Sequence, residues 1–186
     1  MRSIAKITII LSVYSIIGSA ANAGIIWDGP TIVFTKANFA DWTLSQNQDR
    51  LTSDVWITRA DAQGLFNIAQ ETAFTDLGDN TVSPVGTEWA YGVAADWPSL
   101  TFEPWDIWAA DHPPLTVGQN AVLHLIAADA YVDIKFLSWT SGNGAGSTGG
   151  GGFSYQRSTA PVPEPDSINL LFAGALGLLS FTWMRR

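Results

Sequence analysis

The sequence predicts an all-β domain over residues 24–159, folded as an antiparallel β-sandwich or a jelly roll. Three observations favour this class. Apolar and polar residues alternate with a period of two in several short segments. Turns rich in glycine, proline and aspartate separate these segments, and no long stretch has the periodicity of an amphipathic helix. No motif recurs at a fixed interval, so a solenoid or a propeller is not expected.

The clearest predicted strand covers residues 131–140. Its alternation places Val132, Ile134 and Phe136 on one face and charged side chains on the other, as in a half-buried strand. Further strands are expected at 31–35, 87–93, 99–103, 121–127 and 153–158. A short helix at 36–42 is an alternative for that segment, although its length does not support one.

A hairpin is expected from residues 55–59 and 65–69. The turn between them includes Gly64, which we expect to supply the positive φ of a bulged hairpin turn. A second loop, at 141–152, is rich in glycine and lies between two predicted strands, so we interpret it as a mobile hairpin loop and not as a domain linker. Its glycines match the spacing of a dinucleotide fingerprint, but a strand follows where that motif needs a helix, so no nucleotide cofactor is expected.

Charge and cysteine content exclude several functions. Residues 24–160 carry five basic and fifteen acidic side chains, a net charge of −10. An acidic surface repels phosphate backbones, so no nucleic-acid partner is expected. The chain has no cysteine, which excludes thiol catalysis, cysteine metal sites and disulfides. Stability must therefore come from core packing, to which tryptophans contribute large buried areas.

The first 23 residues have the organisation of a secretory signal. Basic Arg2 and Lys6 precede an apolar stretch at 7–17, and small residues follow. The expected signal-peptidase site is Ala21, Ala23 and Gly24. We therefore expect export through a secretion translocon and cleavage by signal peptidase.

The C-terminal end, 160–186, is predicted to anchor the chain in a membrane. Residues 168–184 carry no charge, and a helix of this length spans roughly 26 Å at about 1.5 Å per residue. Arg185 and Arg186 would remain cytoplasmic, as the positive-inside rule requires. Alternate prolines just before the helix hold the preceding residues in an extended conformation, open to a processing enzyme.

This ending resembles a PEP-CTERM sorting signal of Gram-negative bacteria. The residues that carry the resemblance are Val162, Pro163, Glu164 and Pro165, followed by one short span and the closing Arg185 and Arg186. The resemblance implies recognition by an exosortase, removal of the tail, and association with exopolysaccharide and biofilm matrix. It implies an inner-membrane precursor that becomes a cell-surface or matrix protein. Residues 131–161 also resemble a strand, glycine loop and strand cassette of uncharacterised exported bacterial proteins, which implies no function.

No catalytic residue or metal ligand is predicted. The two histidines, His112 and His124, lack metal-ligand spacing, and the chain has no G-x-S-x-G context for a serine nucleophile. Oxygen ligands for calcium cluster at 76–80 and near Asp129 and Asp133, but the loop departs from the calcium-loop pattern, and solvated turns are the favoured interpretation.

Tryptophans beside acids indicate one candidate ligand site. Trp105, Asp106 and Trp108 could stack on a sugar face and bind its hydroxyls, although tryptophans near prolines also commonly seal the end of a sandwich. A glycan hydrolase is a further alternative. Such an enzyme needs two carboxylates close together, and the chain has several acidic residues. The candidates for that pair are Glu71, Glu88 and Glu103. The leading hypothesis is a non-enzymatic surface or matrix protein, with a carbohydrate-binding module as the alternative.

Overall fold

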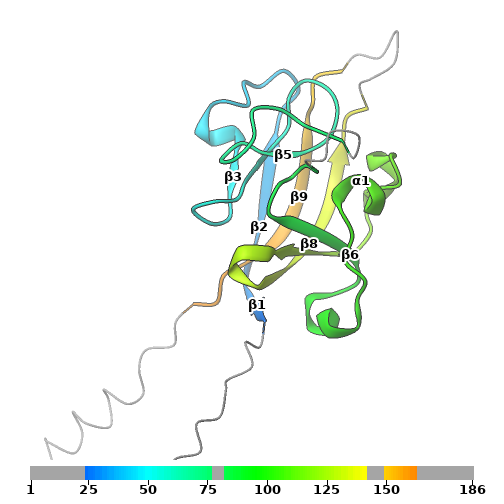
Figure 1. The fold of residues 1–186 in the computed structure, drawn as a ribbon. Helices are drawn as coiled ribbons and strands as arrows, with labels where there is room; N and C mark the ends of the chain where they lie inside the picture. Colours follow the sequence, from blue (N-terminus) through cyan, green and yellow to red (C-terminus); the bar gives the residue numbers. More distant parts are fainter. Residues whose placement is uncertain (1–23, 77–81, 142–148, 163–186) are drawn as a thin grey trace, which may run out of the picture.

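The computed structural model describes residues 24–76, 82–141 and 149–162 of the chain (Figure 1). Strands dominate, so the all-β prediction is confirmed. The strands are β1 Ile25–Trp27, β2 Gly29–Lys36, β3 Asp49–Arg50, β4 Trp56–Thr58, β5 Phe66–Asn67, β6 Thr87–Tyr91, β7 Ala121–Leu125, β8 Ala130–Trp139 and β9 Phe153–Thr159. The helical elements are α1 Trp105–Trp108 and the 3₁₀ turns η1 Ser45–Asn47, η3 Ala94–Ser99, η4 Pro113–Thr116 and η5 Ile126–Ala128.

The larger sheet has six strands and the order β2-β9-β8-β7-β6. All neighbours along this path are antiparallel, and β1 adds to the first residues of β8 in parallel. Strands β1 and β9 pair along the same edge of the long strand β8. This is possible because β1 pairs with the first three residues of β8 and β9 pairs with its second half. The smaller sheet has the order β3-β4-β5.

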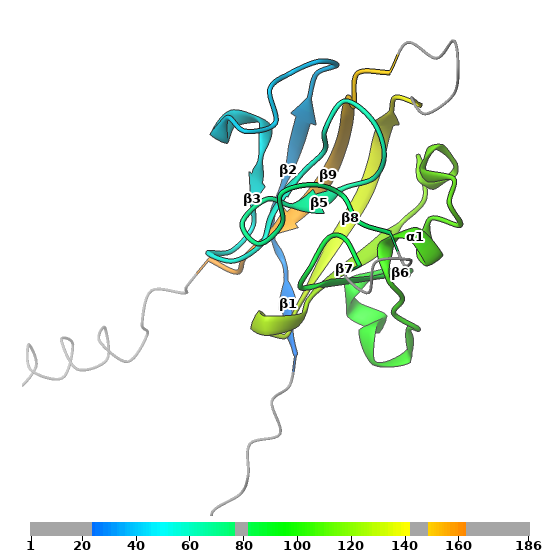
Figure 2. The ribbon, with the colours of Figure 1, turned by 45° about the horizontal axis from the view of Figure 1, so that its top comes forward.

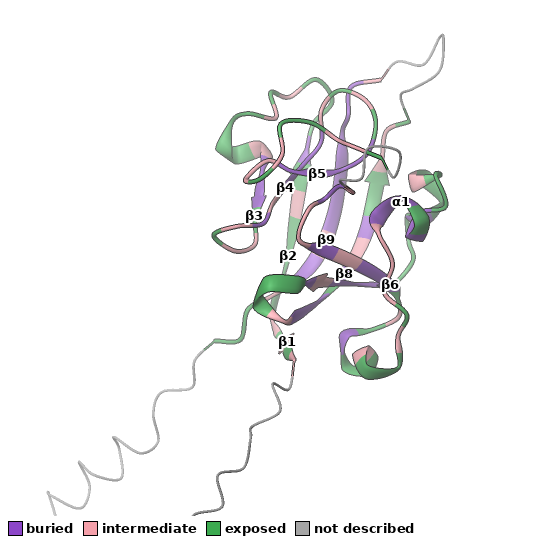
Figure 3. Cartoon of the chain, in the orientation of Figure 1, coloured by how far each residue is buried: buried purple, intermediate pink, exposed green. Residues whose placement is uncertain are grey.

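Strand β8 follows the predicted alternation over most of its length. Val132, Ile134 and Phe136 are buried, and Asp133 between them is exposed. A β-bulge interrupts the register after Phe136 and turns Trp139 toward the same face, where it pairs with Phe153. Figure 3 shows β9 as mostly buried while the edge strand β2 is mostly exposed. The central strands therefore carry the core and the edge strand faces solvent.

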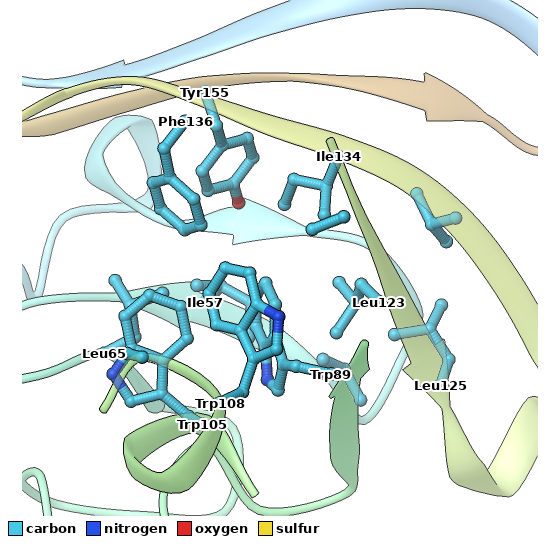
Figure 4. Packing of buried hydrophobic residues seen from close by; sticks show 14 of the residues in the cluster. Ile57, Leu65, Trp89, Trp105, Trp108, Leu123, Leu125, Ile134, Phe136 and Tyr155 are labelled. Atoms are coloured by element: carbon cyan, nitrogen blue, oxygen red, sulfur yellow. The ribbon is translucent and has the colours of Figure 1, made fainter. Parts of the chain in front are cut away.

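The hydrophobic core lies between the two sheets (Figures 2 and 4). Ile57 and Leu65 come from the smaller sheet and its hairpin loop, and Phe136 and Tyr155 lie opposite them on the larger sheet. The core extends to α1 through an aromatic cluster centred on Trp89, which is fully buried. Aromatic side chains thus supply the buried area that a chain without disulfides requires.

A buried ion pair also joins the two sheets. The guanidinium of Arg157 on β9 donates through Nε and Nη2 to both carboxylate oxygens of Asp49 on β3, at 2.6 and 2.7 Å. The hydroxyl of Tyr155 donates to the same carboxylate at 2.7 Å. Burial next to Asp49 raises the pKa of Tyr155 well above its ordinary value. This carboxylate has three strong donors and stabilises the contact between the sheets.

The outer face of the larger sheet carries a smaller apolar cluster. Tyr131 and Val122 are buried there beneath the η3 segment, whose Trp97 stacks on Tyr131 with ring centroids 4.3 Å apart. The backbone N–H of Ala94 donates to Asp133 at 2.7 Å, which holds the start of η3 against the sheet. Part of the outer face is therefore covered by local chain and is not open to solvent.

One predicted strand is wrong, and the helix considered as an alternative at 36–42 is absent. Residues 99–103 do not form a strand: η3 ends at Ser99, and of this segment only Glu103 pairs with the sheet, through an isolated bridge to Trp89. Pro98 lies inside η3 and lacks the N–H that a ladder needs. Residues 36–42 do not form a helix, because Lys36 completes β2 and the chain then turns.

The predicted hairpin of β4 and β5 is confirmed, but its turn differs from the prediction. The positive φ, 67°, belongs to Gln63 and not to Gly64. Gly64 is required for another reason: a Cβ there would collide with the ring of Phe74. A glycine is therefore needed at this position because of close packing, and not because the backbone has a positive φ there.

The glycine-rich segment is also not a mobile loop in its described part. Gly150, Gly151 and Gly152 are buried. Gly151 has φ 62°, and a Cβ there would collide with the carbonyl of Ala60. The side chain of Asn38 accepts a hydrogen bond from the Gly152 N–H at 2.9 Å. The backbone packs closely here, so only glycine fits.

The signal at 1–23 and the span at 168–184 lie outside the described residues. Among the residues that the structure describes, no helix has the length and apolar character needed to cross a membrane.

Candidate functional site

A cavity of about 450 Å³ lies where four parts of the chain meet. They are the segment from α1 to η4, the loop between β4 and β5, the segment after β5 that contains Phe74 and Asp76, and the end of β8. The volume is in the range of roughly 300 to 1,000 Å³ that is usual for small-ligand sites. Its lining combines indole rings with charged side chains. The lining residues used below are Arg59, Trp105, Asp106, Asp111, His112 and Trp139.

The segment that forms one wall has a tight path. Trp105 and Trp108, three residues apart on α1, both enter the core (Figure 4). The helix then ends abruptly because Ala110 and Asp111 have left-handed φ values of 49° and 54°, and the Asp111 N–H donates to the Asp106 carbonyl at 3.0 Å. Left-handed φ at two successive non-glycine residues costs free energy, typically about 1–3 kcal/mol each, which the packing of α1 must offset.

The predicted ligand residues Trp105, Asp106 and Trp108 divide between cavity and core. Trp105 and Asp106 line the cavity, whereas Trp108 lies outside its lining. The indoles of Trp105 and Trp108 are 1% and 4% exposed, because both pack against Trp89. Neither ring therefore offers a free flat face for sugar stacking. Trp105 can contact a ligand only by the part that borders the cavity.

Asp106 is the unusual group of the cavity. Its side chain is 8% exposed, and its Oδ1 atom has no hydrogen-bond partner among the described residues. A buried carboxylate oxygen without a donor costs free energy, whereas a donor or a cation placed against it would recover that cost. Asp106 thus lines the cavity and carries a fully buried oxygen whose desolvation cost no described donor offsets.

Arg59 forms another part of the wall and is 1% exposed. Its guanidinium donates to the carbonyls of Gln63, Thr140 and Gly152 at 2.7, 2.9 and 3.3 Å, and its Cζ lies 3.9 Å from the centre of the Trp139 ring. Burial lowers the pKa of Arg59 to about 10, so the group is still charged at neutral pH. Its contacts are structural and join the β4–β5 loop to both ends of the β8–β9 connection.

Asp111 and His112 are exposed and lie at the cavity lining next to the strained turn. Sequence reasoning missed both as ligand groups, and it also missed Arg59 and Trp139. Trp139 could not have been placed by alternation, because the bulge after Phe136 reverses the side to which it points.

The three glutamates considered for hydrolysis have separate surroundings. Glu71 accepts hydrogen bonds from the Ser83 hydroxyl and from the Asn67 and Val85 N–H groups, the latter two at 2.7 and 2.8 Å. Glu88 lies 3.5 Å from Nδ1 of His124 on the outer face of the larger sheet. The backbone of Glu103 pairs with that of Trp89 in an isolated antiparallel bridge. Glu71 is fully engaged in holding loops together.

His124 lies on the sheet face, as expected for a lone strand histidine. Its ring stacks flat on Tyr131, with centroids 4.5 Å apart, between Glu88 and Asp129. Nε2 lies 3.4 Å from Oδ1 of Asp129, but the geometry is not that of a hydrogen bond. Within the described ranges, no group of three histidine, aspartate or glutamate side chains is arranged to hold a metal ion.

The calcium candidates are only partly visible. Asp76 lines the cavity, and residues 77–80 lie outside the described part of the chain. Asp129 and Asp133 make separate contacts, with Tyr131 and with the Ala94 N–H.

Of the processing residues, only Gly24 and Val162 are described. Gly24 packs against the ring of Tyr131 and Val162 is 70% exposed.

Comparisons with protein-family models, with curated proteins and with solved structures found no match to this chain.

Proposed function

We propose that the chain is an exported, exosortase-processed surface or extracellular-matrix protein without enzymatic activity, associated with exopolysaccharide. The observation that carries this proposal is the order of proline strip, uncharged segment and terminal arginines at 160–186, together with the secretory signal at the other end. The proposed partners are the translocon, signal peptidase, the exosortase and the membrane before processing.

The arrangement of the domain supports this proposal. The described chain begins at β1 and ends after β9 at one end of the molecule (Figure 1). The cavity lies at the other end of β8, because Trp139 lines it whereas β1 pairs with residues as far as Val132. Seven residues of strand separate these positions by about 23 Å. A domain held by its C-terminal end would therefore present the cavity away from the membrane.

The mass of the mature protein from its native cell tests this proposal. We expect a new N-terminus at Gly24 and a C-terminus near Pro163 to Pro165, with or without attached glycan. A full-length chain retained in the inner membrane or cytoplasm of cells that possess an exosortase would contradict it.

A carbohydrate-binding module is the second candidate. The cavity favours it, because indole edges and the exposed side chains of Asp111 and His112 line a site of small-ligand size. Fluorescence titration with polysaccharides and their fragments tests it, since Trp105 and Trp139 border the cavity.

We also propose that the two sheets form a β-sandwich. The shared core between Ile57 and Phe136 and the inter-sheet pair of Asp49 and Arg157 support this architecture. The two-residue strands β3 and β5 make the second layer much smaller than the first.

A further inference from the structure

The two outer edges of the larger sheet differ. At one edge, β6 pairs with Glu103 in an isolated bridge, and the two backbone hydrogen bonds between Glu103 and Trp89 measure 2.8 and 2.9 Å. At the other edge, β2 pairs with β9 on one side only, and residues 31–36 form no further backbone hydrogen bond within the described part of the chain. The free side of β2 therefore presents unpaired N–H and C=O groups, to which another strand can add.

Nothing along the middle of this open edge blocks another strand. Long edges are usually protected by charged side chains, by prolines or by bulges. In β2 the proline and the bulge both lie at the beginning, because Pro30 is its second residue and the register shifts between Gly29 and Ile32. Its one charged side chain, that of Lys36, is buried and donates to two backbone carbonyls. Residues 31–35 are thus an open, uncharged strip.

The side chains of this strip suit a strand that has neighbours on both sides. Val33 is 61% exposed and Ile32 is 39% exposed, although β-branched residues favour a pleated, half-buried surface (Figure 3). Phe34 holds the strip in place, because its ring lies 5.7 Å from each of two aromatic rings of β9. An added strand would therefore meet a fixed edge and would cover apolar surface that is now exposed.

The strip is complementary to itself in charge. Residues 24–160 carry a net charge of −10, so two copies of the chain repel each other across most of their surfaces. Residues 29–35 carry no charge, and two β2 strands can lie side by side without like charges opposite each other. A second copy is thus the partner that this edge fits.

We propose that β2 pairs with β2 of a second copy, antiparallel and centred on Val33, so that the two six-stranded sheets become continuous. A two-fold axis perpendicular to the sheet makes the strands antiparallel and keeps both cores on the same side. Centring on Val33 uses the whole strip 31–35 and leaves out Pro30, which has no N–H. The opposed pairs are Thr31 with the partner's Thr35, Ile32 with the partner's Phe34, and Val33 with the partner's Val33.

This pairing directs the two C-terminal ends away from each other. Gly29 at the start of β2 lies opposite Thr159, near the end of the described chain, so an antiparallel partner has its own C-terminal end at the far end of the shared edge. Two copies anchored in one membrane could not both adopt it. The pairing fits released copies, and this last point rests on the proposed processing.

Cysteine cross-linking tests the pairing, because the chain has no cysteine of its own. Opposed residues of an antiparallel pair have Cβ atoms about 4.5–5.5 Å apart, near the separation of a disulfide. We expect Val33→Cys, in the full-length chain in detergent with at most one chain per micelle, to form a disulfide dimer under mild oxidation. Thr31→Cys and Thr35→Cys should cross-link when mixed and much less when each is alone.

A matched pair of lysine substitutions measures the strength of the contact. The unaltered chain should form a weak dimer that dissociates on dilution, because the strip is short. Val33→Lys sets two like charges opposite each other and should raise the dimer dissociation constant about tenfold in analytical ultracentrifugation. Leu137→Lys makes the same change at an exposed position of the inner strand β8 and should leave it unchanged.

Three results would overturn the inference. The first is a chain that stays monomeric at every concentration, as it would if another segment of the chain covered this edge. The second is equal cross-linking of Val33→Cys and of Leu137→Cys, which indicates random collision. The third is cross-linking of Thr31→Cys with itself as efficient as with Thr35→Cys, which excludes the antiparallel register. None of these bears on export and processing, which the mature mass tests separately.

Discussion

Asp49 and Asp106 are both buried aspartates at the margin of the same core, and they have opposite surroundings. Asp49 is 5% exposed and accepts from Arg157 at both oxygens and from Tyr155. Asp106 is 8% exposed, and its Oδ1 accepts from no described group. The difference separates a carboxylate that holds the two sheets together from one whose buried oxygen has no described donor.

Asp49→Ala should produce the largest effect of this comparison. The substitution leaves the guanidinium of Arg157 buried without its carboxylate, which costs about 3–5 kcal/mol in the free energy of unfolding. Urea denaturation followed by tryptophan fluorescence measures the loss. A change below about 1 kcal/mol, the usual value for an exposed pair, would show that water reaches Arg157 and that the pair does not join the sheets.

Glu71→Ala should have an intermediate effect. Three donors lose their acceptor, two of them backbone N–H groups of Asn67 and Val85, and we expect a cost of about 2 kcal/mol. Glu103→Ala is the matched control, since Glu103 pairs with Trp89 through backbone groups, which the substitution keeps. Equal losses for the two variants in urea denaturation would contradict the structural role of Glu71.

Alkaline pH should lower the free energy of unfolding through the Tyr155 phenol, which donates to Asp49. The pKa of Tyr155 is raised in the fold above its ordinary value of 10.0, so the phenol ionises first in the unfolded chain. Stability is therefore complete below pH 10.0 and falls above it, by at most about 1.4 kcal/mol per pH unit.

Tyr155→Phe isolates this contribution, because the other titrating groups, including Arg59 with its lowered pKa, are common to both proteins. The difference in unfolding free energy between the two proteins should shrink as pH rises above 10.0. A constant difference across this range would mean that the phenol is not held neutral by the fold.

Asp106→Ala should have the smallest effect on stability. Removal of an unpartnered buried carboxylate also removes its desolvation cost, so we expect a change within about 1 kcal/mol, with stabilisation the more consistent direction. Thermal unfolding without ligand measures it beside Asp49→Ala. A loss as large as that of Asp49→Ala would show that Asp106 has a structural donor, and the two sites would then be alike.

Most strands were predictable, because their signal is local. Alternation located β8, and a predicted strand overlaps each of β2, β4, β5, β6, β7 and β9, although β4, β5, β6 and β7 are shorter than predicted. The parallel strand β1 and the two-residue strand β3 were not predicted, since each exists only through its partner, β8 or β4. The strand expected at 99–103 failed because Pro98 and the contact of Asp133 with Ala94 favour a 3₁₀ turn before it.

The candidate site was predictable only in part. Trp105 and Asp106 were identified from composition, because an acid beside aromatic residues is a chemical signal that needs no fold. Trp108 was identified by the same signal and lies outside the cavity lining, since its position on α1 directs it into the core. Arg59 and Trp139 reach the cavity from distant strands and gave no local signal.

The sequence by itself determined the all-β class, the acidic charge and the absence of cysteine chemistry, and it supports the predicted export and sorting signals. These properties depend on composition and on neighbouring residues. The tertiary structure decided which buried aspartate is paired and which is not, where the β8 bulge turns Trp139, and why Gly64 and Gly151 must be glycines. Such outcomes depend on contacts between residues far apart in the chain, and local periodicity carries no information about those contacts.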